Sequence, residues 1–219
     1  TMFKTFTRCC LLGVLAAGSW ASYAQSSFKP DPLVATALPA KPSAHWVWVN
    51  DIVFHHMADG KAFLIDGDAG KMLGMLSTGF SFNGVVLPDD RSLIISPETY
   101  FSRGTRGTRT DVITLYDPRK LSPLGEIQIP PKRAGTLPMI QNSALTDDGR
   151  FLLIYNFTPA QSVTVVDMKS RKFVAEADTA GCAMVYPTGP RSFFSLCNDG
   201  TAVDRKSTRL NSSHLVISY

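Results

Sequence analysis

A β-rich run that ends in aspartate recurs along this chain at intervals of about fifty residues. The segments FLIDGDAG, ITLYDPRK and VTVVDMKS place apolar residues before Asp66, Asp117 and Asp167, so the steps are 51 and 50 residues. In each unit a second run, a third run, a polar turn such as PDDR or TDDGR, and a fourth run follow. Four short strands repeated at this interval are typical of the blades of a β-propeller. The repeat therefore predicts an all-β propeller.

The recurring aspartates are expected to begin tight turns, because an Asp side chain accepts hydrogen bonds from backbone N–H groups two residues on. The alternative is a metal site. Single carboxylates on separate blades do not converge into an oxygen cage, so we predict turns and no metal.

The repeat occupies residues 45–203, which is room for about three blades, whereas propellers close with about four to eight. An open arc would leave apolar blade faces in water. We therefore expect a truncated propeller, the N-terminal part of a longer one. Residues 204–219 break the pattern, and within them 204–214 resemble the translation of a common sequencing-library adapter, so we expect 204–219 to lie outside the fold.

Residues 1–24 have the layout of a secretory signal peptide. Lys4 and Arg8 precede an apolar run at 11–18, and small residues follow before the expected cleavage. The run is too short to span a bilayer, and the alternative, a buried helix, does not account for this order of segments. Residues 25–44 are rich in Ser, Pro and Ala and are expected to form an extended arm. The mature chain is thus expected in an oxidising compartment.

The charge balance excludes two classes of partner. The net charge of +4 comes from the two ends, and between Gln25 and Val203 17 Lys and Arg residues balance 17 Asp and Glu residues. A neutral chain lacks the electrostatic basis for binding nucleic acid or an anionic membrane.

Cys182 and Cys197 are the cysteines that remain after signal removal, and they flank a turn at 188–191. If Pro187 pairs with Ser192, the same register places the two cysteines opposite each other. Opposed strand positions bring Cβ atoms to about 4.5–5.5 Å, close to disulfide range. A bridge across this loop would contribute about 3 kcal/mol. The alternative, a metal site, lacks further His or Cys ligands nearby in the sequence.

Several segments carry a family resemblance: IDGDAGKMLGM at 65–75, FSRGTRGTRTD at 101–111, PPKR at 130–133, AGC at 180–182 with CNDG at 197–200, and Asp-x-Val-Phe-x-His at 51–56. With these the chain resembles the heavy subunit of periplasmic quinoprotein amine dehydrogenases over residues 45–203. The segment at 51–56 and PPKR are similar to the aromatic amine branch, and IDGDAGKMLGM is similar to the methylamine branch. Whether the substrate is an aromatic amine or methylamine therefore stays open.

The resemblance implies a seven-bladed propeller in an α2β2 assembly with a light subunit that carries tryptophan tryptophylquinone. It also implies oxidation of a primary amine to an aldehyde and ammonia, with electrons passed to an azurin- or amicyanin-like cupredoxin. Trp46 and Trp48 lie two residues apart on one expected strand and so share a face. We therefore expect no quinone and no catalytic residue in this chain.

The same resemblance implies that Phe54 shapes the substrate channel where the two subunits meet; the alternative is ordinary packing of a loop aromatic. Arg103, Arg106 and Arg109 form a basic loop expected to contact acidic groups on a neighbouring blade or subunit, rather than a free anion or nucleic acid.

His45, His55 and His56 suggest a metal site, but adjacent histidines on a strand point to opposite faces, so we expect none. The alternative function is a free-standing periplasmic propeller that binds a partner and catalyses nothing.

Overall fold

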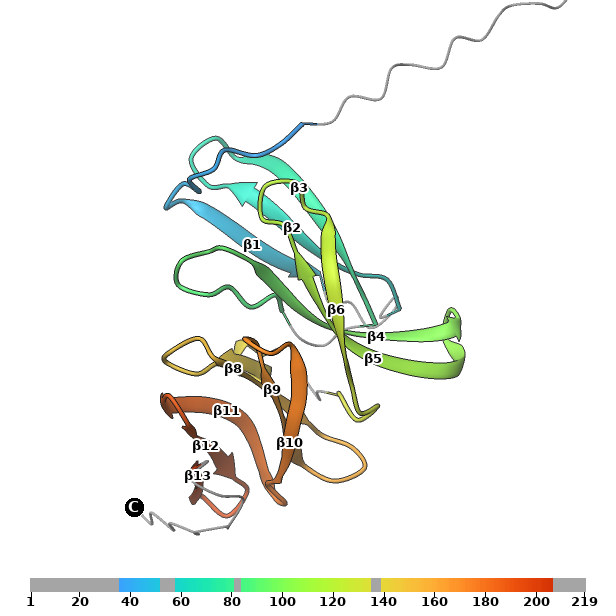
Figure 1. The fold of residues 1–219 in the computed structure, drawn as a ribbon, viewed down its shortest axis with the longest axis vertical. Helices are drawn as coiled ribbons and strands as arrows, with labels where there is room; N and C mark the ends of the chain where they lie inside the picture. The colour runs from blue at the N-terminus through green and yellow to red at the C-terminus, as the bar shows by residue number, and fades with distance from the viewer. Residues whose placement is uncertain (1–35, 52–57, 81–83, 135–138, 207–219) are drawn as a thin grey trace, which may run out of the picture. The chain divides into compact units, whose positions relative to one another are not determined.

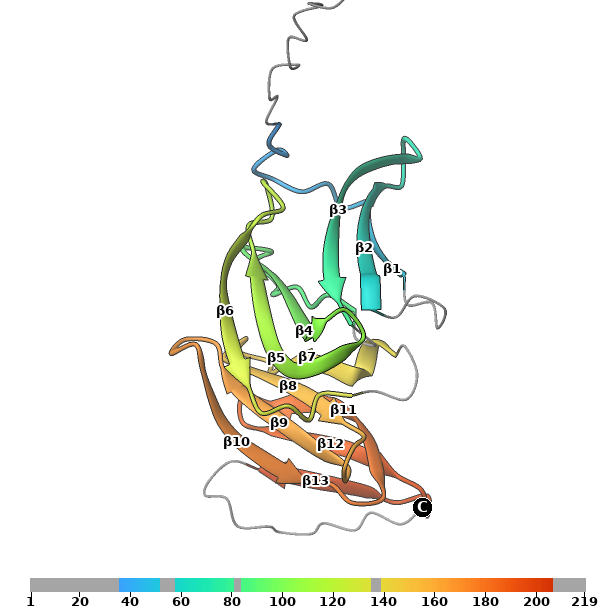
Figure 2. The same ribbon diagram turned by 90° about the vertical axis from the view of Figure 1, so that its right-hand side faces the viewer.

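The structure is a computed structural model that describes residues 36–51, 58–80, 84–134 and 139–206. These residues form four antiparallel sheets of thirteen strands (Figures 1 and 2). A 3₁₀ turn at Ile140–Asn142 lies among them. Within each sheet, strands adjacent in sequence are adjacent in space, so each sheet is a simple meander.

The first sheet contains β1 (Trp46–Asp51), β2 (Gly60–Asp66) and β3 (Lys71–Gly79). The second contains β4 (Ile94–Arg103), β5 (Arg106–Tyr116) and β6 (Pro123–Ile129). The third contains β7 (Ser143–Leu145), β8 (Phe151–Asn156), β9 (Ser162–Asp167) and β10 (Lys172–Asp178). The fourth contains β11 (Cys182–Gly189), β12 (Ser192–Cys197) and β13 (Ala202–Lys206).

The predicted turns at the repeated aspartates are confirmed. Each carboxylate accepts hydrogen bonds from the backbone N–H groups two and three residues on, at 3.0 and 3.2 Å for Asp66, 2.7 and 3.0 Å for Asp117, and 2.9 and 3.1 Å for Asp167. The N–H of Lys120 contributes most to lowering the pKa of Asp117, and that of Ser170 most to lowering the pKa of Asp167.

In the sequence, each repeat unit was counted from the run that ends in aspartate. In the structure, the sheets begin at a different run of the unit. In the second and third units the third run opens a new sheet: β7 and β11 pair with the strands that follow them. Residues 84–87, expected as a strand, contribute an isolated bridge from Val86 to Ile95 of β4. The reason is local, because the short polar turns after these runs fold them back onto the next strand.

Successive sheets pack face to face through apolar side chains. Ala62 and Leu76 of the first sheet meet Ile94 and Tyr116 of the second. The second and third sheets share the cluster Ile95, Ile113, Leu115, Ile127, Ile129, Leu152, Ile154 and Val166. The third and fourth share Leu153, Tyr155, Val163, Val185 and Phe193. This stacking of small meanders is the packing expected of propeller blades.

The opposite face of the first sheet is apolar and exposed. Val47 and Val49 of β1 and Met72 and Met75 of β3 are each 45–59 % exposed. Strand register places all four on one face, together with the half-buried Phe63. No other part of the described chain packs over these side chains, so this is the open blade face that the sequence predicted.

The fourth sheet contains the predicted disulfide. Cys182 lies opposite Cys197, and the two are bonded. The predicted pairing of Pro187 with Ser192 is wrong, since Pro187 lies opposite Phe193 and the hairpin closes at Gly189. Two register shifts between the cysteines and the turn account for the difference, and bulges of this kind could not be read from the spacing.

Strand β13 extends beyond Val203. Residues 204–206, which the sequence reasoning set outside the fold, pair with Phe194, Phe193 and Ser192 of β12. Backbone hydrogen bonds to an edge strand depend little on side-chain identity, which is why the composition of these residues did not reveal the pairing.

Candidate docking site at the hairpin end of the sheets

Two of the segments that carry the family resemblance, 101–111 and 130–133, lie at one end of the first two sheets. Asp51 and Gly79, the last residues of β1 and β3, lie at this end. Phe80 forms a bridge with Thr99 of β4, which joins the first sheet to the second here. Strands β4 and β5 continue past this point as a two-stranded hairpin (Figure 1). We call it the hairpin end.

Phe54 lies outside the described residues, as do His55 and His56. Asp51, the last described residue before them, pairs with Lys61 at the hairpin end. His45 lies before β1, at the other end of the sheet, where its Nδ1 is 2.7 Å from the carboxylate of Asp68. Both of those side chains are exposed.

The hairpin stands clear of the second sheet. Strand β5 pairs with β6 from Asp111 onward, so residues 100–110 pair only within the hairpin among the described strands. Gly104, with a φ of 73°, occupies the turn, where a left-handed backbone conformation favours glycine. Arg103 lies opposite Arg106, and both are exposed. Neither forms an ion pair with another described residue.

Arg109 differs from the other two arginines because its acidic partner is on its own strand. Its Nε and Nη2 donate to the two carboxylate oxygens of Asp111 at 2.8 and 2.7 Å, and Nη2 also donates to the carbonyl oxygen of Arg133. The backbone N–H of Arg133 donates to Asp111 at 2.8 Å. The Asp111 side chain is fully buried, so this bidentate pair closes the base of the hairpin.

Arg133, from the PPKR segment, completes the same cluster. Its guanidinium is buried and donates to Thr99 Oγ1 through Nε at 3.0 Å and Nη2 at 2.7 Å, and to the carbonyl oxygen of Phe80. Burial lowers the pKa of Arg133 to about 10, while the negative charge of Asp111 acts in the opposite direction. Arg133 therefore stays charged at neutral pH.

Two segments that carry the family resemblance thus meet in one buried cluster, formed by Thr99, Arg109, Asp111 and Arg133. Next to it, Glu98 is fully buried and accepts hydrogen bonds from the hydroxyls of Tyr100 at 2.7 Å, Tyr116 at 2.9 Å, and Thr114. Burial, together with Glu98, raises the pKa of both tyrosines, so they remain neutral donors.

Sequence reasoning missed the roles of Thr99 and Glu98. The available signal was the polar stretch SPET at 96–99 inside an apolar strand, since buried polar side chains require partners. Because Arg109 pairs with Asp111 and the Arg133 guanidinium donates to Thr99 and to the carbonyl oxygen of Phe80, the cluster is suited to holding the hairpin in place.

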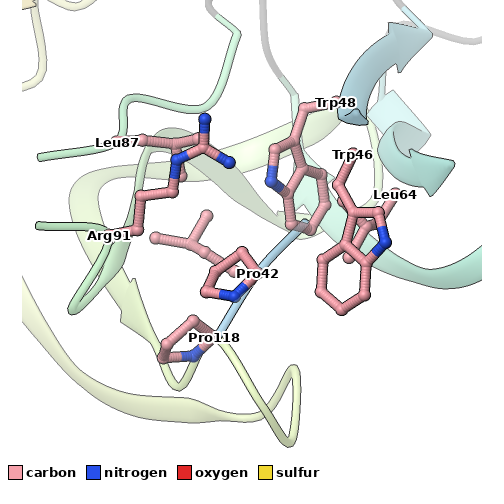
Figure 3. A pocket seen from close by; sticks show the side chains of 8 residues that line it. Pro42, Trp46, Trp48, Leu64, Leu87, Arg91 and Pro118 are labelled. Atoms are coloured by element: carbon pink, nitrogen blue, oxygen red, sulfur yellow. The ribbon is translucent and has the colours of Figure 1, made fainter. Parts of the chain in front are cut away.

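An apolar hollow lies at the opposite end of the first two sheets. It is lined by Pro42, Trp46, Trp48, Leu64, Leu87, Arg91, Ile94 and Pro118 (Figure 3). Figure 3 shows Trp46 and Trp48 entering it from the same strand, with the side chain of Arg91 across from them. Among the described residues that line it, the charged side chain is that of Arg91.

The described ranges contain neither a candidate metal cluster nor a candidate membrane span. No three His, Cys, Asp or Glu residues there are placed to hold a metal ion. No helix in that part of the chain is long and apolar enough to cross a membrane.

Comparisons with known proteins place the chain in a family. A family model for the methylamine dehydrogenase heavy chain (MADH) matches residues 43–209. The methylamine dehydrogenase heavy chain of Paracoccus versutus is 35% identical over 172 residues, which cover 78% of this chain and 39% of that protein. The heavy chain of Methylorubrum extorquens is 33% identical over 192 residues, covering 86% and 45%. The chain thus spans less than half the length of these relatives.

Among solved structures, dihydro-heme d1 dehydrogenase NirN in complex with DHE superposes with a TM-score of 0.55 at 19% identity, covering 83% of this chain and 38% of that one. This likeness confirms the propeller fold and nothing more. The match to the family model covers most of the sequence and reaches Arg209, beyond the last described strand. The chain therefore belongs to the family of methylamine dehydrogenase heavy chains.

Proposed function

We propose that this chain is part of the heavy subunit of a periplasmic amine dehydrogenase. The complex would oxidise a primary amine to an aldehyde and ammonia and pass the electrons to a cupredoxin. The chain would serve as scaffold, channel wall and docking surface. The observation that carries the proposal is the family match over 43–209, supported by relatives at 33–35% identity.

The partner in this proposal is a small light subunit that carries tryptophan tryptophylquinone, in an α2β2 assembly. When bound in its subunit, that group would accept the electrons of the amine. Trp46 and Trp48 leave one strand toward one hollow (Figure 3), so they do not supply two tryptophans from separate segments. The proposal therefore places the quinone on the other chain.

The open apolar face of the first sheet supports a longer ring. Four exposed side chains at 45–59 % exposure would be costly in an isolated protein, so we propose that further blades of the complete heavy chain cover them. The disulfide between Cys182 and Cys197 supports export to an oxidising compartment, in keeping with a cleaved signal peptide at 1–24.

Co-expression tests the function directly. The complete heavy chain would be produced with its light-subunit gene and the genes for quinone maturation. We expect the two subunits to co-purify, to show quinone absorbance, and to reduce an artificial electron acceptor when either methylamine or an aromatic amine is added. A heavy chain that elutes alone and lacks that absorbance would instead support the free-standing binding protein.

Phe54 is proposed to line the amine channel. In the assembled enzyme, Phe54→Ala should change the ratio of kcat/KM for an aromatic amine to that for methylamine by about tenfold or more, the size of one apolar contact in a specificity pocket. Phe173→Ala, which truncates an exposed aromatic on edge strand β10, is the matched control. An unchanged ratio in the Phe54 variant would refute the channel role.

A further inference from the structure

The hairpin formed by residues 100–110 carries a charge that the described fold does not neutralise. The segment contains three arginines and no acidic residue. Arg103 and Arg106 face each other directly across the two strands. Like charges in directly opposed positions destabilise a strand pair. A pair of arginines in this place therefore costs stability unless something outside the hairpin binds it.

The nearest acids are already engaged. Asp111 is occupied by Arg109, by the backbone of Arg133 and by Thr99. Glu98 is enclosed by hydroxyl donors and is fully buried. Among the described residues, no other carboxylate forms an ion pair with the two arginines at the tip. Both side chains are exposed, and each guanidinium offers five N–H donors to acceptors on another molecule.

The hairpin is rigid at its base, which lowers the entropic cost of binding. The buried Arg109–Asp111 pair locks β5 to the segment after β6. The Thr108 N–H donates to Ser102 Oγ at 3.0 Å across the strands. The ring of Phe101 packs edge-on against Phe80, with 5.9 Å between centroids. A preorganised element loses little conformational freedom when it docks.

We propose that this hairpin is a docking element that binds an acidic surface of the light subunit, with Arg103 and Arg106 as the contacting residues. The inference rests on the proposed function. Its position supports that partner, because the hairpin leaves the sheets at the same end as Asp51, which directly precedes the 52–57 segment expected to meet the light subunit. Guanidinium groups bind carboxylates in a bidentate manner, so the matching surface carries Asp or Glu side chains.

The test uses the complete heavy chain and the purified light subunit. The dissociation constant would be measured for the unsubstituted protein, for Arg103→Gln/Arg106→Gln and for Arg103→Lys/Arg106→Lys. Measurements at about 0.01 M and about 1 M salt span Debye lengths of about 30 and 3 Å. Lys120→Gln, which removes an exposed cation at the opposite end of the same sheet, is the matched control. Circular dichroism would verify that all variants fold.

We expect the double glutamine variant to bind about tenfold more weakly at low salt and to lose most of the salt dependence of its dissociation constant. The reason is that attraction between opposite charges speeds the association of the two proteins, and dissolved salt screens that attraction. The lysine variant should retain part of the affinity, and Lys120→Gln should bind normally. An affinity in the glutamine variant equal to that of Lys120→Gln would overturn the docking role and leave the proposed function intact. If the unsubstituted chain fails to bind the light subunit, both proposals fall.

Discussion

Asp111 holds the hairpin-end cluster together, and replacing it with asparagine tests that cluster most directly. Its carboxylate accepts four hydrogen bonds: two from Arg109, one from the backbone of Arg133 and one from the hydroxyl of Thr99. Asparagine preserves the shape and one acceptor. It removes the negative charge and turns an N–H₂ group toward donors, so at least two of the four bonds are lost.

The expected cost follows from burial. Removing one partner of a buried ion pair costs about 3–5 kcal/mol, because the remaining charge stays buried without compensation. The guanidinium of Arg133 is fully buried here. The side chain of Arg109 is 28% exposed, so water can solvate it once the pair is broken. We therefore expect Asp111→Asn to lower the free energy of unfolding by about 3 kcal/mol, the lower end of that range.

The assay is urea unfolding of the complete heavy chain, followed by circular dichroism. Asp199→Asn is the control, since Asp199 lies in an exposed turn and, among the described residues, accepts hydrogen bonds from the backbone and hydroxyl of Thr201. The double variant Arg109→Met/Asp111→Asn should lose less than the two single variants added together, because each already breaks the same pair. A loss below about 1 kcal/mol for Asp111→Asn, or strict additivity, would refute the account of the cluster.

Two further predictions concern the turn at Asp167 and the contact of Gly79 with the hairpin. The Ser170 N–H is the largest of the interactions that lower the pKa of Asp167 below its unfolded value of about 3.9, so ionised Asp167 stabilises the fold above that pH and the contribution is lost as pH falls through the folded-state pKa. Asp167→Asn should therefore reduce the fall of Tm at acidic pH. An equal fall of Tm in the variant and in the unsubstituted protein would contradict the turn assignment. Gly79 has a φ of +60°, and an added Cβ would lie 2.8 Å from the Tyr100 ring, so Gly79→Ala should cost more than about 1 kcal/mol in urea unfolding. Gly125→Ala, with nothing within 4 Å of its Cβ, is the control, and equal losses would show that the contact is unimportant.

Much of the fold was readable from local patterns. Asp66, Asp117 and Asp167 begin the turns that their spacing predicted, because an Asp side chain bonds to its own backbone without help from the rest of the chain. The opposition of Cys182 and Cys197 was also predicted, although the register between them shifts twice. Those shifts were not readable, since a bulge depends on how a strand twists against its neighbours.

The buried cluster was only partly readable. The segments at 101–111 and 130–133 stood out in the sequence, yet nothing in either indicated that Arg109 and Arg133 share Asp111. The sequence instead led us to expect that Arg109 would contact an acid on a neighbouring blade or subunit. The structure places its partner two residues away on the same strand, because both side chains point to one face of β5.

The sequence alone determined the class of fold, the three aspartate turns, the pairing of the two cysteines and the family resemblance. These properties depend on local hydrogen bonding, on the alternation of side chains along strands, and on motifs that can be recognised in the amino-acid sequence alone. The tertiary structure decided which strands share a sheet, which arginines are buried and which remain free at the hairpin tip. Such contacts join residues that are distant along the chain, and packing between whole sheets selects them.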